Sequence, residues 1–180
     1  MSTELPSRIR ALSSSAQVTI VASTYNEKFT TALLENCLAE LSESGNRIEV
    51  KVVRVPGAFE VPVTVKRAIM KPELHEKPDV VIALGVVLRG STAHADLIGT
   101  AVTNQLLSIA CDTLTPVIHE VLLLDDEQQA FARCIASSLN RGREAARAAI
   151  AMLNMLEDQN ELVSAARRTS KVDLSASIMR

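Results

Sequence analysis

The chain has three histidines, the side chain best matched to proton transfer near neutral pH. His94 follows the polar run Arg89-Gly90-Ser91-Thr92 and has Asp96 close by, which makes it the first candidate for a general acid and base. A histidine with a purely structural role is the alternative, and the residues alone leave both open. His75 lies in a polar loop (71–78), and we assign it no chemistry.

The run from Arg89 to Thr92 has the composition of an anion site. Gly90 would let the backbone approach a ligand closely, Ser91 and Thr92 offer hydroxyl and N–H groups, and the start of the next helix adds its positive dipole end. A plain Ser/Thr N-cap is the structural alternative. The run is not a Walker loop, because no GKS or GKT follows, and a GxGxxG dinucleotide fingerprint is absent.

Three further side chains could contact a ligand. His119 lies within an expected strand, as either a half-buried polar group or a ring that stacks on a ligand. Arg133 stands in an otherwise apolar stretch, and Arg141 directly precedes a long expected helix; the alternative for both is a solvated helix charge. No spacing of His, Cys, Asp and Glu indicates a metal site.

Strand-like and helix-like periodicity alternate four times along the chain. The expected strands are residues 17–23, 47–55, 79–88 and 115–124. The expected helices are residues 28–43, 59–70, 93–111, a segment from about 127, and 143–158, beyond which we expect a continued helix and then a frayed tail. This order predicts βαβ units, and hence a flavodoxin-like three-layer α/β/α sandwich: a four-stranded parallel sheet with helices on both faces.

In such sheets, ligands bind beyond the carboxyl ends of the strands. Residues 24–27, 56–60 and 89–96 follow the first three strands, so these turns should meet at one edge. The turns contain Tyr25 and Phe59, two of only four aromatic residues in the chain. Core packing would scatter aromatic residues along helix faces, so this clustering favours a binding site.

Length and composition indicate one globular domain. With 180 residues, 47% hydrophobic and 22% charged, the chain is ordinary globular protein, and we expect an N-terminal arm (1–15), a domain (16–158) and a C-terminal extension (159–180). A net charge of −2 gives no support to nucleic-acid binding through a strong basic field. We find neither an apolar run long enough for a membrane span nor a secretory signal, and expect a cytoplasmic protein.

The cysteines are odd in number and show no CxxC spacing. Cys37, Cys111 and Cys134 all fall in apolar segments with helical periodicity. We therefore expect three small buried thiols in a reducing compartment, with no disulfide bond.

Two segments, VPGAFEVP (55–62) and ALGVVLRGSTAHAD (83–96), resemble the 6,7-dimethyl-8-ribityllumazine synthase family. Weaker similarity in residues 23–30, 116–130 and 140–146 extends the resemblance from about Val18 to Met155. The resemblance implies condensation of 5-amino-6-ribitylaminouracil with 3,4-dihydroxy-2-butanone 4-phosphate, the penultimate step of riboflavin biosynthesis. It also implies that no metal or redox cofactor takes part.

The resemblance implies a role for each residue singled out above. His94 corresponds to the proton donor and acceptor, Arg133 to a phosphate-binding arginine, and Ser91 with Thr92 to the phosphate loop. The residues implied to form the pyrimidine and ribityl pocket are Tyr25, Ala58, Phe59, Glu60, Val86, Val87, Leu88 and His119. Asn26 and Arg141 are further candidates.

The resemblance also implies a homo-pentamer, alone, paired or in a sixty-subunit shell. Its active site would lie between subunits, with His119 and Arg133 supplied by the neighbour. His119 replaces a typical aromatic residue, Glu120 a small residue and Arg141 a lysine. Because a histidine can take up a proton, His119 would make the affinity for the neutral pyrimidine depend on pH between 6 and 8.

Two alternatives to the enzyme remain, one from these departures and one from the expected fold. The departures at positions 119, 120 and 141 keep open a shell-forming or flavin- or lumazine-binding relative with little or no turnover. An electron-transfer flavodoxin is disfavoured, because residues 24–27 after the first strand are not a phosphate loop rich in Ser, Thr and Gly.

Overall fold

The computed structural model describes residues 5–8, 10–45, 47–71 and 77–178, with side chains through residue 164. Its strands are β1 (Ala16–Ser23), β2 (Ile48–Val55), β3 (Val80–Leu88) and β4 (Val117–Leu124). They form one parallel sheet in the order β2-β1-β3-β4, which confirms the expected fold. The first seven residues of β3 are buried, as expected for an apolar strand that is covered on both faces.

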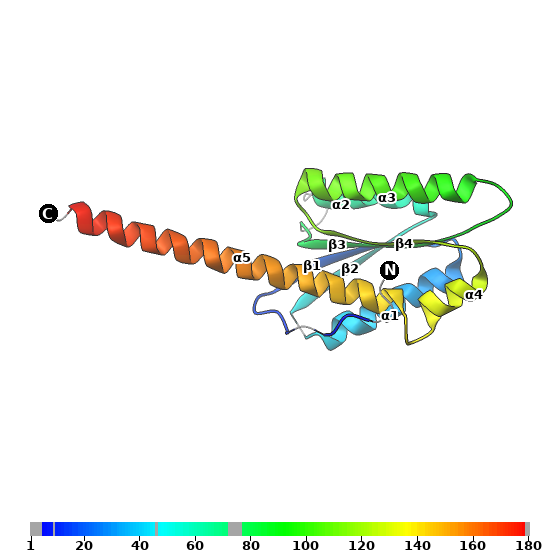
Figure 1. Cartoon of the computed structure of the whole chain (residues 1–180), viewed down its shortest axis with the longest axis horizontal. Coiled ribbons are helices and arrows are strands. Elements are labelled where there is room, and N and C mark those ends of the chain that lie inside the picture. The colour runs from blue at the N-terminus through cyan, green and yellow to red at the C-terminus, as the bar shows by residue number, and fades with distance from the viewer. Residues whose placement is uncertain (1–4, 9, 46, 72–76, 179–180) are drawn as a thin grey trace.

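Helices cover both faces of the sheet (Figure 1). The helices on one face are α1 (Glu27–Glu43), the short α4 (Glu127–Ala130) and α5 (Arg141–Ile178), and those on the other are α2 (Val61–Met70) and α3 (His94–Thr113). Each face has its own apolar core. Two details differ from the expected helices: a 3₁₀ turn (Ala58–Glu60) precedes α2, and a π-helical segment (Phe131–Ile135) follows α4.

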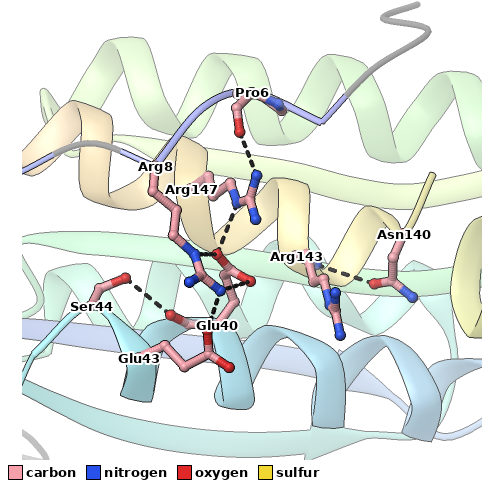
Figure 2. Close-up of polar contacts among 8 residues, drawn as sticks. All are labelled: Pro6, Arg8, Glu40, Glu43, Ser44, Asn140, Arg143 and Arg147. Atoms are coloured by element: carbon pink, nitrogen blue, oxygen red, sulfur yellow. Dashed lines mark hydrogen bonds and ion pairs between the residues drawn. The ribbon is translucent and has the colours of Figure 1, made fainter. Parts of the chain in front are cut away.

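Helix α5 begins two residues earlier than expected because Asn140 caps it. The Asn140 side-chain oxygen accepts a hydrogen bond from the Arg143 N–H (3.1 Å), and its amide donates to the Cys134 carbonyl (2.8 Å), as Figure 2 shows for the first contact. The helix continues to Ile178 where we expected a frayed tail, and its last turns project beyond the body of the molecule (Figure 1).

The expectation of three buried thiols is wrong at one position. Cys37 and Cys134 are buried, but Cys111 is exposed. Helix α3 turns its Val102, Leu106 and Ile109 side chains to the sheet. Cys111 follows Ile109 by two residues, which places it about 200° around the helix, on the outer face.

The N-terminal arm is fastened to α1 and α5 around one buried carboxylate, that of Glu40 (Figure 2). Arg8 and Arg147 both donate to its Oε1 atom, at 2.7 and 2.8 Å, and Arg147 also donates to the Pro6 carbonyl. The hydrogen bond from Arg8 is the main reason that the pKa of Glu40 falls to about 2. Leu12, further along the arm, is part of the apolar core.

We predict that Glu40→Ala lowers the free energy of unfolding by about 3 kcal/mol, since it leaves the largely buried guanidinium of Arg147 without a carboxylate partner. Glu43→Ala removes an exposed carboxylate from the same Arg8 and should cost less than about 1 kcal/mol. Urea unfolding at pH 7 measures both. Because folding depresses the pKa of Glu40, its contribution is complete above pH 4.5 and is lost as the pH falls toward 2. Equal losses in the two variants would contradict this role for Glu40.

A second stability prediction concerns Gly142, where α5 crosses α1. A Cβ atom at this position would lie 2.2 Å from the Leu33 carbonyl oxygen, so Gly142→Ala must push two backbones apart. We expect a loss of about 3 kcal/mol in the free energy of unfolding. Gly90→Ala is the matched control, because a Cβ atom there meets nothing within 4 Å. A thermal midpoint for Gly142→Ala equal to that of the control would refute the close packing.

Candidate active site

The carboxyl ends of β1, β2 and β3 and the start of α3 enclose a cleft of about 390 Å³, which we name the first cleft. Its lining consists of Tyr25, Asn26, Pro56, Gly57, Ala58, Phe59, Glu60, Val86, Val87, Leu88, His94 and Ile98. The structure therefore brings His94 together with most of the residues that the sequence predicted for the pyrimidine and ribityl pocket.

Two aromatic rings stand open to solvent in this cleft. Tyr25 is 67% exposed and Phe59 62% exposed, whereas Phe29 is buried in the core. Leaving large rings in water forfeits the free energy of burying them, so the exposure of both rings in one cleft favours a flat ligand that stacks on them. Gly57 admits the Tyr25 ring, because a Cβ atom there would lie 3.1 Å from Tyr25 Cδ2.

Hydrogen bonds fix the turns that form the first cleft. Glu60 Oε2 accepts from the Gly57 N–H (2.9 Å), which holds the carboxylate over the turn after β2. Asn26 takes the left-handed backbone conformation that asparagine tolerates well, and its side-chain amide donates to the Val86 carbonyl (2.9 Å). The turn after β1 is thereby tied to β3.

The loop from residue 89 to 93 contains the residues expected to form an anion site, and one of them, Arg89, is already engaged within the chain. Arg89 is paired with Asp96 (2.6 Å) and with Asp125, and these two carboxylates raise its pKa, so its charge is already compensated. Ser91 and Thr92 are exposed and lie outside the lining of the first cleft. A Cβ atom on Gly90 would meet open space, so close packing within the chain does not explain that glycine.

The alternative role for the same loop was a Ser/Thr N-cap on the following helix, and the structure does not show that cap. Helix α3 begins at His94, its N-cap is Ala93, and no side chain among the described residues caps it. The hydroxyls of Ser91 and Thr92 are therefore not used to cap α3.

The other predicted residues line a second cleft, of about 590 Å³, along the outer edge of β4; we name it the edge cleft. Its lining consists of Gly99, Thr100, Thr103, Asn104, His119, Glu120, Val121, Leu122, Leu123, Leu124, Arg133 and Arg141. It shares no residue with the first cleft. His119, Arg133 and Arg141 are thus brought together, but away from His94.

The strand register gives the distance between the two groups. His119 pairs with Ala83 in β3, five residues before Leu88 at the first cleft. At ~3.3 Å per residue, His119 lies roughly 16 Å from the end of the sheet where His94 stands. His94 and His119 of one chain therefore line two separate clefts.

Both nitrogens of His119 are engaged within the chain. Nδ1 accepts from the Val121 N–H (3.1 Å), which places the ring proton on Nε2, 2.8 Å from the Thr103 hydroxyl. Burial lowers the pKa of His119 below its ordinary value of 6.5, so the ring is neutral at pH 7 and above. This argues against the expected pH dependence from His119 between pH 6 and 8, and moves any such effect to more acidic pH.

Glu120 is the residue that sequence reasoning noted only as a departure. It lies in the edge cleft with Arg141, whose Nη1 is 3.9 Å from Glu120 Oε1 and 2.5 Å from Glu144 Oε2. Burial raises the pKa of Glu120 to about 7, against the opposite effect of Arg141 and Arg133. A carboxylate within the apolar run VIHEVLLL was the signal in the sequence.

Two kinds of site are absent from the part of the chain that the structure describes. No three His, Cys, Asp or Glu side chains there are grouped so that they could hold a metal ion. None of the helices described combines the length and the apolar character that crossing a bilayer requires.

Comparison with known proteins identifies the family. Residues 15–157 match the family model described as 6,7-dimethyl-8-ribityllumazine synthase. A protein of that name from Nitrobacter hamburgensis is 36% identical over 151 residues, 83% of this chain and 91% of the relative. Another, from Chlorobium phaeobacteroides, is 38% identical over 141 residues, 78% of this chain and 88% of the relative. The chain therefore belongs to the 6,7-dimethyl-8-ribityllumazine synthase family of transferases.

Proposed function

We propose that this protein condenses 5-amino-6-(D-ribitylamino)uracil with 3,4-dihydroxy-2-butanone 4-phosphate. The products are 6,7-dimethyl-8-ribityllumazine, inorganic phosphate and water, and the reaction is the penultimate step of riboflavin biosynthesis. The observation that carries the proposal is the first cleft, where His94 stands beside two exposed aromatic rings in a chain of this family.

The pyrimidine substrate fits the first cleft by its chemistry. Tyr25 and Phe59 offer ring faces to a flat heterocycle, and Glu60 is placed to accept hydrogen bonds from ribityl hydroxyls. Residues Val86–Leu88, at the end of β3, provide the apolar floor and main-chain groups. The bond from Asn26 to the Val86 carbonyl keeps this floor in register with the Tyr25 turn.

The reaction requires two substrates to be held together and protons to be moved between them. The amine adds to the ketone and loses water to form an imine, phosphate is eliminated, and a second loss of water accompanies ring closure. His94, which begins α3 and lines the first cleft, would carry the protons of these steps. Positioning of the two substrates should supply most of the rate enhancement.

We further propose that a second copy of the chain completes the site. The first cleft lacks an unpaired arginine, since Arg89 is held by two carboxylates, and Arg133 lies in the edge cleft. A head-to-tail contact that sets one chain's edge cleft against the next chain's first cleft would bring Arg133 close to Ser91 and Thr92, which we propose hold the phosphate. Such contacts close into rings, which fits a homo-pentamer, alone or in a decamer or 60-mer.

Apolar side chains exposed on α2 and α3 support burial against a neighbour. They are Val63, Met70, Leu97 and Leu107, each more than half exposed in the single chain. Light scattering should therefore find a mass of five chains or a multiple of five. A monomer at the concentration of the assay would contradict the shared site.

Mixing the purified protein with both substrates tests the function. We expect the lumazine absorbance and free phosphate to rise together, in equal amounts and over many turnovers. Lumazine that binds to the protein without being formed would instead favour a binding relative that lacks turnover. If neither lumazine nor free phosphate is formed, the proposed function is overturned.

A further inference from the structure

The edge cleft holds a carboxylate where an anion is proposed to bind. The side chain of Glu120 is 12% exposed, and it shares the cleft with Arg133 and Arg141. The charged and titratable groups that interact electrostatically with Glu120 come from three helical segments: Arg141 and Glu144 from α5, Arg133 and Cys134 from the π-helical segment, and Cys37 from α1.

A carboxylate in this place competes with any anion for the same cations. The negative charges of Glu120 and Glu144 act against the positive charges of Arg141 and Arg133. When Glu120 takes up a proton, the net charge of this group of side chains rises by one. Because the groups are half-buried, this change is screened much less than it would be at the surface. A doubly charged anion should therefore bind most tightly when Glu120 is neutral.

We propose that Glu120 is a positioning residue that links anion binding in the edge cleft to the uptake of one proton. The inference rests on the proposed function for the class of ligand, a phosphate ester, but not for the cleft itself. Glu120 has no ring to stack on the pyrimidine, and its carboxylate cannot donate a hydrogen bond to phosphate, so this role differs from those proposed for the other residues. Glu120 would set the pH at which Arg133 is available to the substrate.

The surroundings make Glu120 the group to consider near neutral pH. Its pKa is raised to about 7 by burial. The same burial raises the pKa values of Cys37 and Cys134 to about 12 and lowers that of His119, so both thiols and the imidazole are neutral between pH 7 and 8. A charge change in the cleft over this range is then assigned to Glu120.

Sulfate is the probe for the test, because it keeps two negative charges from pH 6 to 8 whereas phosphate titrates. Calorimetry on the assembled wild-type protein, at constant ionic strength, should show the Kd for sulfate rising about tenfold from pH 6 to pH 8, as linkage to one proton requires. Glu120→Gln should bind sulfate at pH 8 about as tightly as the wild type at pH 6, with no slope against pH.

Two controls separate Glu120 from other groups. Glu43→Gln changes an exposed carboxylate outside both clefts, and His119→Gln removes the neighbouring imidazole; both should keep the wild-type slope. If Glu120→Gln fails to assemble, Glu120→Ala can replace it, because it too removes the titratable carboxylate. Wild-type affinity that does not change with pH, a slope that persists without Glu120, or no sulfate binding would each overturn the inference.

The outcome is distinguishable from a failure of the proposed function. Lumazine formation is measured on the same preparations. If lumazine is formed but the Kd for sulfate does not change with pH, the role of Glu120 is refuted and the proposed enzymatic function still stands. If the sulfate affinity depends on pH through Glu120 but the protein forms no lumazine, the proton-linked anion cleft is supported and the proposed enzymatic function is refuted.

Discussion

His94→Gln should lower kcat for lumazine formation by about 100-fold or more, the usual loss when a general acid and base is removed. Glutamine has a similar length and still forms hydrogen bonds, but it cannot exchange a proton near pH 7. Because His94 is exposed at the first turn of α3, the substitution should leave KM for both substrates within a small factor. Steady-state absorbance at saturating substrate measures the effect.

The structural control for this variant is its stability. His94 packs into neither core, so His94→Gln should unfold within about 0.5 kcal/mol of the wild type. A variant that folds and assembles normally and keeps more than half of the wild-type kcat would remove His94 from the reaction.

Arg133→Ala should raise KM for the four-carbon phosphate by about 10- to 100-fold, since a charge-assisted hydrogen bond is worth roughly 1.5–3 kcal/mol. The KM for the pyrimidine should change little, because its pocket lies in the first cleft. Arg133→Lys should recover part of the affinity through charge alone. Initial rates with one substrate varied at a time separate the two constants.

Arg143→Ala is the matched control, because Arg143 is a partly buried arginine of α5 that lines neither cleft. Its KM values should equal those of the wild type. If Arg133→Ala raised only the KM for the pyrimidine, Arg133 would contact the pyrimidine and not the four-carbon phosphate. If the KM for the four-carbon phosphate were unchanged, Arg133 would not bind that substrate.

The sequence predicted the sheet because periodicity is a local property. The apolar run 79–88 suits a central strand that is covered on both faces, and in a parallel sheet the turns after three strands meet at one edge. The gathering of Tyr25, Phe59 and His94 followed from that geometry. Their implied roles came from family resemblance rather than from periodicity.

Long-range pairings were beyond sequence reasoning. Arg89 begins the run that we expected to form an anion site, but its guanidinium is paired with Asp96 and with Asp125, 36 residues away. Glu40 is matched with Arg147 across 107 residues, and nothing local marks either residue. The separation of His119 from His94 depends on the register of β4 against β3, and the pKa of Glu120 depends on burial by three other elements.

The central claim is that the first cleft of one chain works with the edge cleft of the next, and co-assembly of two differently impaired variants tests it most directly. His94→Gln and Arg133→Ala chains, unfolded together and reassembled in equal amounts, would place an intact His94 opposite an intact Arg133 in about a quarter of the head-to-tail contacts. We expect the mixed assembly to recover about that share of wild-type activity at low phosphate-substrate concentration, far above either variant reassembled alone. Activity no greater than the average of the two variants, in assemblies shown to contain both chains, would contradict a site shared between subunits.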